Sequence, residues 1–591
     1  MKAKIVNNNG NLIFEINGKR VIPAAYMSYL EDNADYSGFK QAGYNLFCAC
    51  VYMGDCPVNE LSGVLPFNDH VWKSRDKFDF TPVYDSVKRI VGEEKEGYVI
   101  LRVNLNTPLW WRKENPDELL VLTDGKKYNQ SIFSEKWHED AKLCLTKLVE
   151  YVKNFEFSEN IVAIQVAGMQ TEEWIAMWTP TGTLDISPCA QKAFATWCKK
   201  RRKEKFIHYV PTVEETRARN ACTVVPESEH AALTEYLHFI CDGHASAIRE
   251  FSAYVKSIAP HLLVGTFYGY IGQIPCDRGH NAVSKLLHDK NIDFFASPFA
   301  YVDGRKGAKD WFYHGVMNSC SLAGKLWFLE ADVRTHLTQP LHQTHPKLMS
   351  GENTVKAFKA PVWMGPSTEE ESLWQLLRSF AKVLISKHAY WWFDMWGGWY
   401  DTPKMMELMR STLALYRTEM ERPTKGLSEM AVILDEEASY ALGEEHFYQT
   451  HFHQLVALGF TGVPYDIYHL SDVEKIKKNY KVLFYLMPSQ EGEKGNVLVS
   501  RHERIKKSER FTPSEIVEFL KKSGVHVWSE GNIVYANSRF VCVTATTEGS
   551  IKLNVPHACR LKAFTSGKIY EGKEFTFEFQ YDQTELFEVM E

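Results

Sequence analysis

Eight apolar runs of strand length recur through the first 400 residues, and segments with helical periodicity separate them. Parallel strands that are covered on both faces have such near-continuous apolar sequences, and eight strand–helix units close into a (β/α)8 barrel. We therefore predict a barrel over residues 1–425, with long loops after the strands, because a bare barrel needs only ~250 residues. The runs begin near residues 21, 44, 98, 161, 262, 292, 325 and 389.

The pattern changes after about residue 425. Short strand-like segments at 429–437, 459–470, 480–488 and 524–528 alternate with helical patterns at 451–458 and 513–523, which predicts an open α/β domain with a parallel sheet over 426–539. From 540 to 591 the sequence alternates with period two and turns at glycines. These last residues are predicted to form a small antiparallel β domain.

Charge, cysteine content and missing motifs exclude several classes of partner and enzyme. The net charge is −6 with one basic cluster at 199–205, so no nucleic-acid partner is expected. Twelve cysteines without C-x-x-C pairs, an N-terminus without an apolar signal segment and no apolar run of about 18 residues predict a cytoplasmic protein without a membrane partner. Phosphate-binding, dinucleotide-binding and serine-hydrolase motifs are absent from the sequence.

Aromatic residues gather where the eighth strand should end. Residues 391–403 read WWFDMWGGWYDTP, in a chain with 16 tryptophans. Flat rings beside carboxylates are suited to sugars, whose C–H faces stack on them. The carboxyl ends of barrel strands line the active site, so the polar and aromatic residues at these ends are the candidate site residues. The candidates are Arg102 and Asn104 from strand three, Gln170, Glu172 and Glu173 from strand four, Tyr268 from strand five, Glu330, Asp332, Arg334 and His336 from strand seven, and Trp391, Trp392, Asp394 and Trp396 from strand eight.

Carboxylates at the ends of strands four and seven face each other across a barrel mouth. At about 5 Å apart, one can attack an anomeric carbon while the other protonates the leaving oxygen, whereas at about 6.5–9.5 Å the pair would invert the configuration. Glu330 is the predicted nucleophile and Glu172 the predicted acid/base, with Asp332 and Glu173 as their alternatives. The other candidates are expected to bind substrate or orient the carboxylates, and this chemistry needs no metal or organic cofactor.

The segments NLIFEINGKRVIPAAYMSY, IVAIQVAGMQTEEW and LWFLEADVRTH are similar to the opening, acid/base and nucleophile segments of clan A retaining glycoside hydrolases. The chain resembles glycoside hydrolase family 42 β-galactosidases in its order of barrel, flavodoxin-like α/β domain and small β domain. Thr171 stands where the clan usually has an asparagine before the acid/base, which suggests a divergent family, near the β-mannosidases of glycoside hydrolase family 164.

The resemblance implies an exo-acting β-glycosidase that cleaves a terminal hexose from short oligosaccharides. Galactose is the first choice for that hexose. It also implies a homotrimer assembled through the α/β domain. β-Mannosidase or β-glucosidase activity is an alternative, and a barrel that binds sugar without turnover is an alternative from another class.

Overall fold

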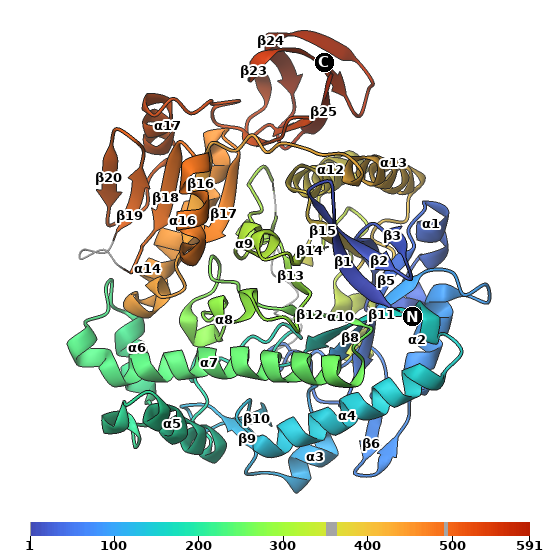
Figure 1. The fold of residues 1–591 in the computed structure, drawn as a ribbon, viewed down its shortest axis with the longest axis vertical. Helices are drawn as coiled ribbons and strands as arrows, with labels where there is room; N and C mark the ends of the chain where they lie inside the picture. The colour runs from blue at the N-terminus through green and yellow to red at the C-terminus, as the bar shows by residue number, and fades with distance from the viewer. Residues whose placement is uncertain (1, 306, 350–362, 490–494, 591) are drawn as a thin grey trace.

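Eight parallel strands close into a barrel in the first part of the chain (Figure 1). The structure, a computed structural model, describes residues 2–305, 307–349, 363–489 and 495–590. Each strand falls on one of the predicted apolar runs, so the predicted (β/α)8 barrel is confirmed. In chain order the barrel strands are β4 (Ala24–Met27), β5 (Leu46–Tyr52), β8 (Tyr98–Asn104), β11 (Ile161–Ala167), β12 (Leu263–Phe267), β13 (Phe294–Pro298), β14 (Leu326–Ala331) and β15 (Ala389–Phe393).

The barrel strands are buried on both faces. Every residue of β5, β11 and β15 is buried, because one set of alternating side chains fills the barrel and the other lies under helices. Arg102 of β8 pairs in register with Gln165 of β11, and Glu330 of β14 pairs with Trp391 of β15. This register brings an arginine, a glutamate and a tryptophan to the same end of the barrel.

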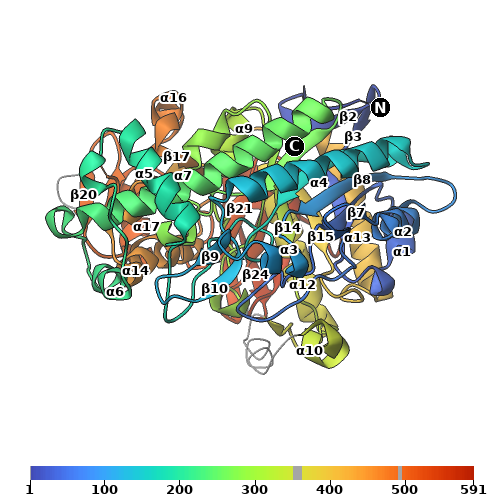
Figure 2. The same cartoon turned by 90° about the horizontal axis from the view of Figure 1, so that it is seen from below.

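Amphipathic helices form the outer layer. α4 (Glu135–Asn154) and α7 (Glu227–Ile258) lie side by side along the barrel in both views (Figures 1 and 2). α12 (Glu369–Ser386) begins at a capping box formed by Thr368 and Glu371 and packs beside α13 (Pro403–Met420). The helices therefore shield the outward faces of the strands.

A three-stranded antiparallel sheet precedes the barrel. Phe14 of this sheet is fully buried, and its ring lies 5.8 Å from that of Phe328 in β14. The amide of Ala3 donates to the carbonyl of His261, just before β12. The sheet thus covers the amino-terminal end of the barrel, opposite the end that carries the candidate site. Its strands are β1 (Ala3–Asn8), β2 (Asn11–Ile16) and β3 (Lys19–Val21).

The second sheet is mixed, so the prediction of a parallel sheet was only partly right. The order is β17-β16-β18-β19-β20; the first three strands are parallel, and β19 and β20 are antiparallel to their neighbours. The links before β19 and β20 are too short for the crossover of a dozen or more residues that parallel strands need. The strands are β16 (Met430–Leu434), β17 (Tyr465–His469), β18 (Val482–Leu486), β19 (Asn496–Val499) and β20 (Arg504–Lys507).

The segment 524–528, predicted as a strand, has no strand structure. The amide of His526 donates to the carboxylate of Glu429, and that of Trp528 donates to the carbonyl of Gly462. The Trp528 carbonyl accepts the amide of Asn554 from the C-terminal sheet, so the segment makes single bonds to several neighbours instead of a strand ladder. The predicted helix before it is present as α17 (Pro513–Lys522).

The C-terminal antiparallel sheet was predicted correctly as a type of structure. Its order is β21-β22-β25-β23-β24, and it includes β21 (Ile533–Ala536), which lies before residue 540. β22 and β25 pack against α12 of the barrel (Figure 1). The remaining strands are β22 (Phe540–Thr544), β23 (Gly549–Ala563), β24 (Ile569–Phe579) and β25 (Thr584–Met590).

Candidate active site

Glu330 lies at the carboxyl end of β14 and is 5% exposed. Arg102 Nη2 donates to its Oε2 at 2.6 Å, and Trp391 Nε1 donates to the same oxygen at 3.2 Å. The Arg102 guanidinium is itself buried, 4.7 Å from the ring centroid of Phe267. Both donors bond one oxygen, and Oε1 takes part in neither bond. Glu330 is therefore held in a fixed orientation at the end of the strand.

The loop after β11 has an unusual backbone. Four of its residues between 169 and 174 have positive φ although none of them is glycine. Such conformations cost on the order of 1–3 kcal/mol each and are found where the surroundings hold a functional segment in place. The residues are Met169 (61°), Thr171 (55°), Glu172 (66°) and Trp174 (60°).

Glu173 is the partly exposed carboxyl of this loop. Tyr270 donates its hydroxyl to Glu173 Oε1 at 2.9 Å, and Thr171 Oγ1 lies 2.7 Å from Oε2. Burial, and next the negative charge of Glu330, raise the pKa of Glu173 to about 7. A carboxyl with a pKa near 7 is protonated in a large fraction of molecules at neutral pH, as a general acid must be.

Glu172 points into a buried network instead. It is 1% exposed, accepts a hydrogen bond from Tyr29 at Oε2 (2.8 Å), and accepts another from Asn104 at Oε1 (3.2 Å). Arg102 Nη1 donates to the Tyr29 hydroxyl at 3.1 Å and lies 3.7 Å from Glu172 Oε2. Burial raises the pKa of Glu172 as well. Both of its oxygens hold neighbouring side chains, so this carboxyl is better placed to orient Arg102 and Asn104 than to meet a substrate.

Asp332 is fully enclosed. Arg305 donates to its Oδ1, Arg334 Nη1 donates to Oδ2 at 2.5 Å, and the Tyr301 hydroxyl donates to Oδ2 at 2.9 Å. A carboxylate held by two arginines has no approach to a substrate. This geometry counts against Asp332 as nucleophile, and it makes Arg334 its ion-pair partner.

The two adjacent tryptophans of β15 lie on opposite faces, because successive strand residues alternate. Trp391 faces the barrel interior and Glu330. Trp392 Nε1 donates to the Tyr44 hydroxyl at 2.8 Å, and its ring lies 5.9 Å from that of Tyr400. Trp392 thus points away from the site, contrary to the expectation that it would contact substrate.

Asp394 shapes the WGGW turn. It accepts the amides of Gly398 and Trp399 at 3.0 and 2.9 Å and the Tyr26 hydroxyl at 3.0 Å. Burial raises its pKa to about 7. With its oxygens bound to the turn, Asp394 positions Trp396, whose ring centroid lies 6.4 Å from that of Tyr29.

Two further candidates, Tyr268 and His336, bond other parts of the protein. Tyr268 is fully buried and donates its hydroxyl to the carbonyl of Gly279 at 2.8 Å. His336 Nδ1 lies 3.3 Å from Ser372 Oγ in α12. The structure gives both side chains protein partners, and neither of these bonds involves Glu330 or Glu173.

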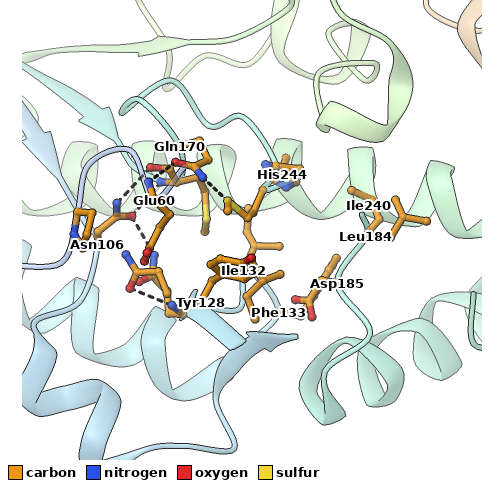
Figure 3. Close-up of a pocket in the computed structure, with 17 residues that line it drawn as sticks. Glu60, Asn106, Tyr128, Ile132, Phe133, Gln170, Leu184, Asp185, Ile240 and His244 are labelled. Carbon is orange, nitrogen blue, oxygen red and sulfur yellow. Dashed lines mark hydrogen bonds between the residues drawn. The ribbon is translucent and has the colours of Figure 1, made fainter. Parts of the chain in front are cut away.

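Gln170 lines a separate cavity, shown in Figure 3. Glu60, Asn106 and Gln170 lie toward one end of it, and Leu184 and Ile240 lie toward the other. The Gln170 side chain accepts the amide of Glu60 at 3.0 Å. Neither Glu330 nor Glu173 lines this cavity, so Gln170 supports the loop from behind rather than facing the two carboxylates.

Three residues that contact Glu172 or Glu173 were not among the predicted site residues: Tyr29 and Tyr270 bond the carboxylates, and His280 bonds the Glu173 backbone. The end of strand five offered both Tyr268 and Tyr270, and only Tyr268 was chosen; Tyr29 follows the first barrel strand. His280 lies ten residues past Tyr270 in a loop and gave no sequence signal. Its Nε2 lies 3.0 Å from the Glu173 carbonyl oxygen, and its Nδ1 accepts the amides of Gly269 and Tyr270. Burial holds its pKa well below the usual value, so His280 is a neutral imidazole with a fixed tautomer.

Within residues 2–305, 307–349, 363–489 and 495–590, no three His, Cys, Asp or Glu side chains come together as a metal site would require. Over the same residues, no helix combines the length and apolar character needed to cross a bilayer.

Comparison with known proteins gives structural relatives only. No family model matches the sequence, and no curated protein matches it. Among solved structures, a β-galactosidase from the psychrophilic Marinomonas ef1 is similar with a TM-score of 0.61 at 9% identity, covering 96% of this chain and 100% of that one. A catalytic mutant of Gan42B, a glycoside hydrolase family 42 β-galactosidase from G. stearothermophilus, has a TM-score of 0.57 at 11% identity, with 96% and 98% covered. A β-galactosidase from Bacillus circulans sp. alkalophilus has a TM-score of 0.54 at 12% identity, with 96% and 98% covered. The chain therefore has, over nearly its whole length, the fold that these β-galactosidases share.

Proposed function

We propose that this protein is a retaining β-glycosidase, with Glu330 as nucleophile and Glu173 as acid/base. The observation that carries the proposal is the contrast between two carboxyl groups that influence each other. Glu330 is held by Arg102 and Trp391, while Glu173 has its pKa raised to about 7, in part by the charge of Glu330. Glycoside hydrolysis uses one carboxyl group that attacks the anomeric carbon and a second one that donates a proton.

The reaction would proceed by two displacements. Glu330 attacks the anomeric carbon while Glu173 gives its proton to the departing glycosidic oxygen, and a glycosyl-enzyme forms. Glu173, now ionised, takes a proton from water, and the resulting attack releases the sugar and frees Glu330. Arg102 and Trp391 would orient Glu330, and Tyr270 and Thr171 would orient Glu173.

Choosing Glu173 over Glu172 follows from accessibility. Glu173 is partly exposed, and Glu172 is 1% exposed with both oxygens bound by Tyr29 and Asn104. A general acid must come within hydrogen-bond reach of the substrate oxygen. We assign Glu172 to positioning Arg102 and Asn104.

Galactose is the first choice for the terminal sugar, because the similar structures named above are β-galactosidases. We further propose exo action on short oligosaccharides and a trimer formed through the domain at 426–539. Light scattering of the purified chain would test the trimer: a mass near three times 68.1 kDa supports it, and a monomer mass contradicts it.

The test is hydrolysis of 4-nitrophenyl β-galactoside, β-mannoside, β-glucoside and β-fucoside, with the anomer of the first product followed by NMR. Retention of configuration is expected, with loss of turnover in Glu330→Gln and a fall of roughly 10²–10⁴ in Glu173→Gln. Inversion would contradict the double displacement. Inactivity on every glycoside, together with measurable binding of a free sugar, would support a sugar-binding protein instead.

A further inference from the structure

Asn106, labelled in Figure 3, lies two residues past the end of β8 and beside the loop that carries Glu172 and Glu173. It is 4% exposed, and its side chain bonds both backbone groups of Met169. The Met169 amide donates to Asn106 Oδ1 at 2.9 Å, and Asn106 Nδ2 donates to the Met169 carbonyl at 3.1 Å. Met169 is the first of the four loop residues with positive φ, so Asn106 holds the loop where it leaves the barrel.

The orientation of the Asn106 amide is fixed by Gln130, which ends β10 (Lys127–Gln130) and is 1% exposed. Gln130 Nε2 donates to Asn106 Oδ1 at 3.0 Å, while Gln130 Oε1 accepts the backbone amide and the hydroxyl of Thr107, both at 3.0 Å. A backbone amide can only donate, so Thr107 fixes which end of the Gln130 side chain is oxygen. Gln130 fixes the Asn106 side chain in the same way. The chain of bonds therefore runs in one direction, from the Thr107 backbone to the Met169 carbonyl.

A second branch of this network reaches Glu172. The backbone amide of Asn106 donates to Asn104 Oδ1 at 2.9 Å, and Asn104 Nδ2 donates to Glu172 Oε1 at 3.2 Å. The loop is therefore held at two points, the Met169 backbone and the Glu172 carboxylate. Neither branch involves the side chain of Glu173, which stays partly exposed.

A residue in the left-handed region keeps that conformation only when its surroundings hold it there. We propose that Asn106, supported by Gln130, is a positioning residue that keeps the loop in the conformation in which Glu173, and not Glu172, presents its carboxyl to the substrate. Asn106 acts through the backbone of Met169. The inference rests on the proposed glycosidase function for its effect on turnover, whereas its effect on the loop can be measured without turnover.

The first test is Asn106→Leu, which introduces a side chain of similar size without hydrogen-bonding groups. Without its two bonds to Met169, the loop should relax and displace Glu173. A displacement of about 1 Å can lower the rate about 100-fold, so kcat should fall by that order while KM changes little. A native kcat in Asn106→Leu would overturn the inference.

The pH profile gives a second readout, one that a loss of folding stability alone would not move. Burial and the charge of Glu330 raise the pKa of Glu173 to about 7, and Tyr270 and Arg102 oppose them more weakly. A relaxed loop exposes the carboxyl and takes it away from Glu330. The alkaline limb of kcat/KM should therefore move down by about one pH unit in Asn106→Leu, and a limb that stays near pH 7 contradicts the inference.

Asn160→Leu is the matched control. Asn160 is 7% exposed and precedes the opposite end of β11, where its Nδ2 donates to the carbonyls of Lys95 and Gly97 at 2.7 and 2.8 Å. The same substitution there removes two bonds to backbone without reaching the loop, so kcat should stay within about threefold of the native value. Equal effects of Asn160→Leu and Asn106→Leu would mean that both act through general stability, which overturns the positioning role.

Gln130→Met removes the donor to Asn106 with an uncharged side chain of similar length, and it remains testable if Asn106→Leu does not fold. It should lower kcat in the same direction. Because the two side chains act in one network, the double variant should be no slower than Asn106→Leu alone. Losses that multiply in the double variant contradict a shared network.

Hydrogen exchange followed by mass spectrometry reads the loop itself. In Asn106→Leu, peptides that cover residues 168–178 should exchange at least about tenfold faster than in the native chain, and Asn160→Leu should leave them unchanged. Native exchange rates in Asn106→Leu refute the inference even if the chain hydrolyses glycosides. If the native chain hydrolyses no glycoside, faster exchange still supports the hold of Asn106 on the loop, and only the proposed function fails.

Discussion

Replacing Tyr270 with phenylalanine should shift the pH profile of hydrolysis. Tyr270 donates to Glu173 Oε1 at 2.9 Å, and this bond lowers the pKa of Glu173 against the larger effects of burial and of Glu330. A hydrogen bond to a charged group is worth about 1.5–3 kcal/mol and one between neutral groups about 0.5–1.5 kcal/mol. The ionised form of Glu173 therefore loses roughly 1–1.5 kcal/mol more than the protonated form when the hydroxyl is removed.

At 1.36 kcal/mol per pKa unit, this difference raises the pKa of Glu173 by about one unit. Because the general acid works in its protonated form, kcat/KM falls as the pH rises through that pKa. The alkaline limb should lie near pH 7 in the native protein, as the Glu173 pKa of about 7 requires. In Tyr270→Phe it should lie about one unit higher, near pH 8.

The assay is kcat/KM for an aryl β-glycoside from about pH 5 to 9, the range that brackets the Glu173 pKa. Tyr268→Phe is the matched control, because Tyr268 is two residues away and bonds a backbone carbonyl instead of Glu173. It should leave the alkaline limb in place. If Tyr270→Phe leaves the limb near pH 7, or if Glu173→Gln keeps it, the group that titrates is not Glu173 and its assignment as acid/base fails.

Three further changes test other parts of the structure. Trp391→Phe removes a donor to Glu330 and should lower kcat/KM by roughly 10- to 100-fold, from about 1.5–3 kcal/mol, whereas Trp392→Phe should change it less than threefold; equal effects would contradict the opposite orientations of these rings. His280→Leu removes the partner of the Glu173 carbonyl and of two backbone amides. We expect kcat to fall about tenfold and the alkaline limb of the pH profile to shift. An unchanged pH profile would show that His280 has no positioning role. Asp310→Ala leaves Lys382 as an unpaired buried charge and should cost about 3–5 kcal/mol of unfolding free energy in urea, while a loss below about 1 kcal/mol would mean that Lys382 finds another partner or is neutral.

The barrel could be predicted because its strands are buried on both faces and therefore carry a continuous apolar signal. The second sheet was harder to predict. Its strand order and directions depend on link lengths and on the pairing of β18 with β19, which no single segment reveals. The segment 524–528 has the composition of a strand, but its backbone bonds the Glu429 side chain, the Gly462 carbonyl and the Asn554 amide one at a time. Periodicity reports burial, and it does not report which backbone groups meet.

The nucleophile segment was easier to place than the acid/base loop for a physical reason. Glu330 lies in a regular strand, so counting along β14 gives the face on which its side chain lies. Trp392 shows that the same count must be applied strictly, since it predicts opposite faces for Trp391 and Trp392, and both were expected in the site.

Glu172 and Glu173 could not be ranked from the sequence, because period-two counting ends where the strand ends. The loop carries left-handed conformations at Thr171, Glu172 and Trp174, and each such residue turns the chain in a way that residue types alone do not predict. Because of these turns, the Glu172 side chain bonds Tyr29 and Asn104, and the Glu173 side chain bonds Tyr270. One loop thus delivers a buried carboxyl that orients Arg102 and a partly exposed carboxyl with a pKa suited to proton transfer. Two adjacent glutamates can take different roles here because the backbone between them is held in a conformation that an ordinary strand end would not adopt.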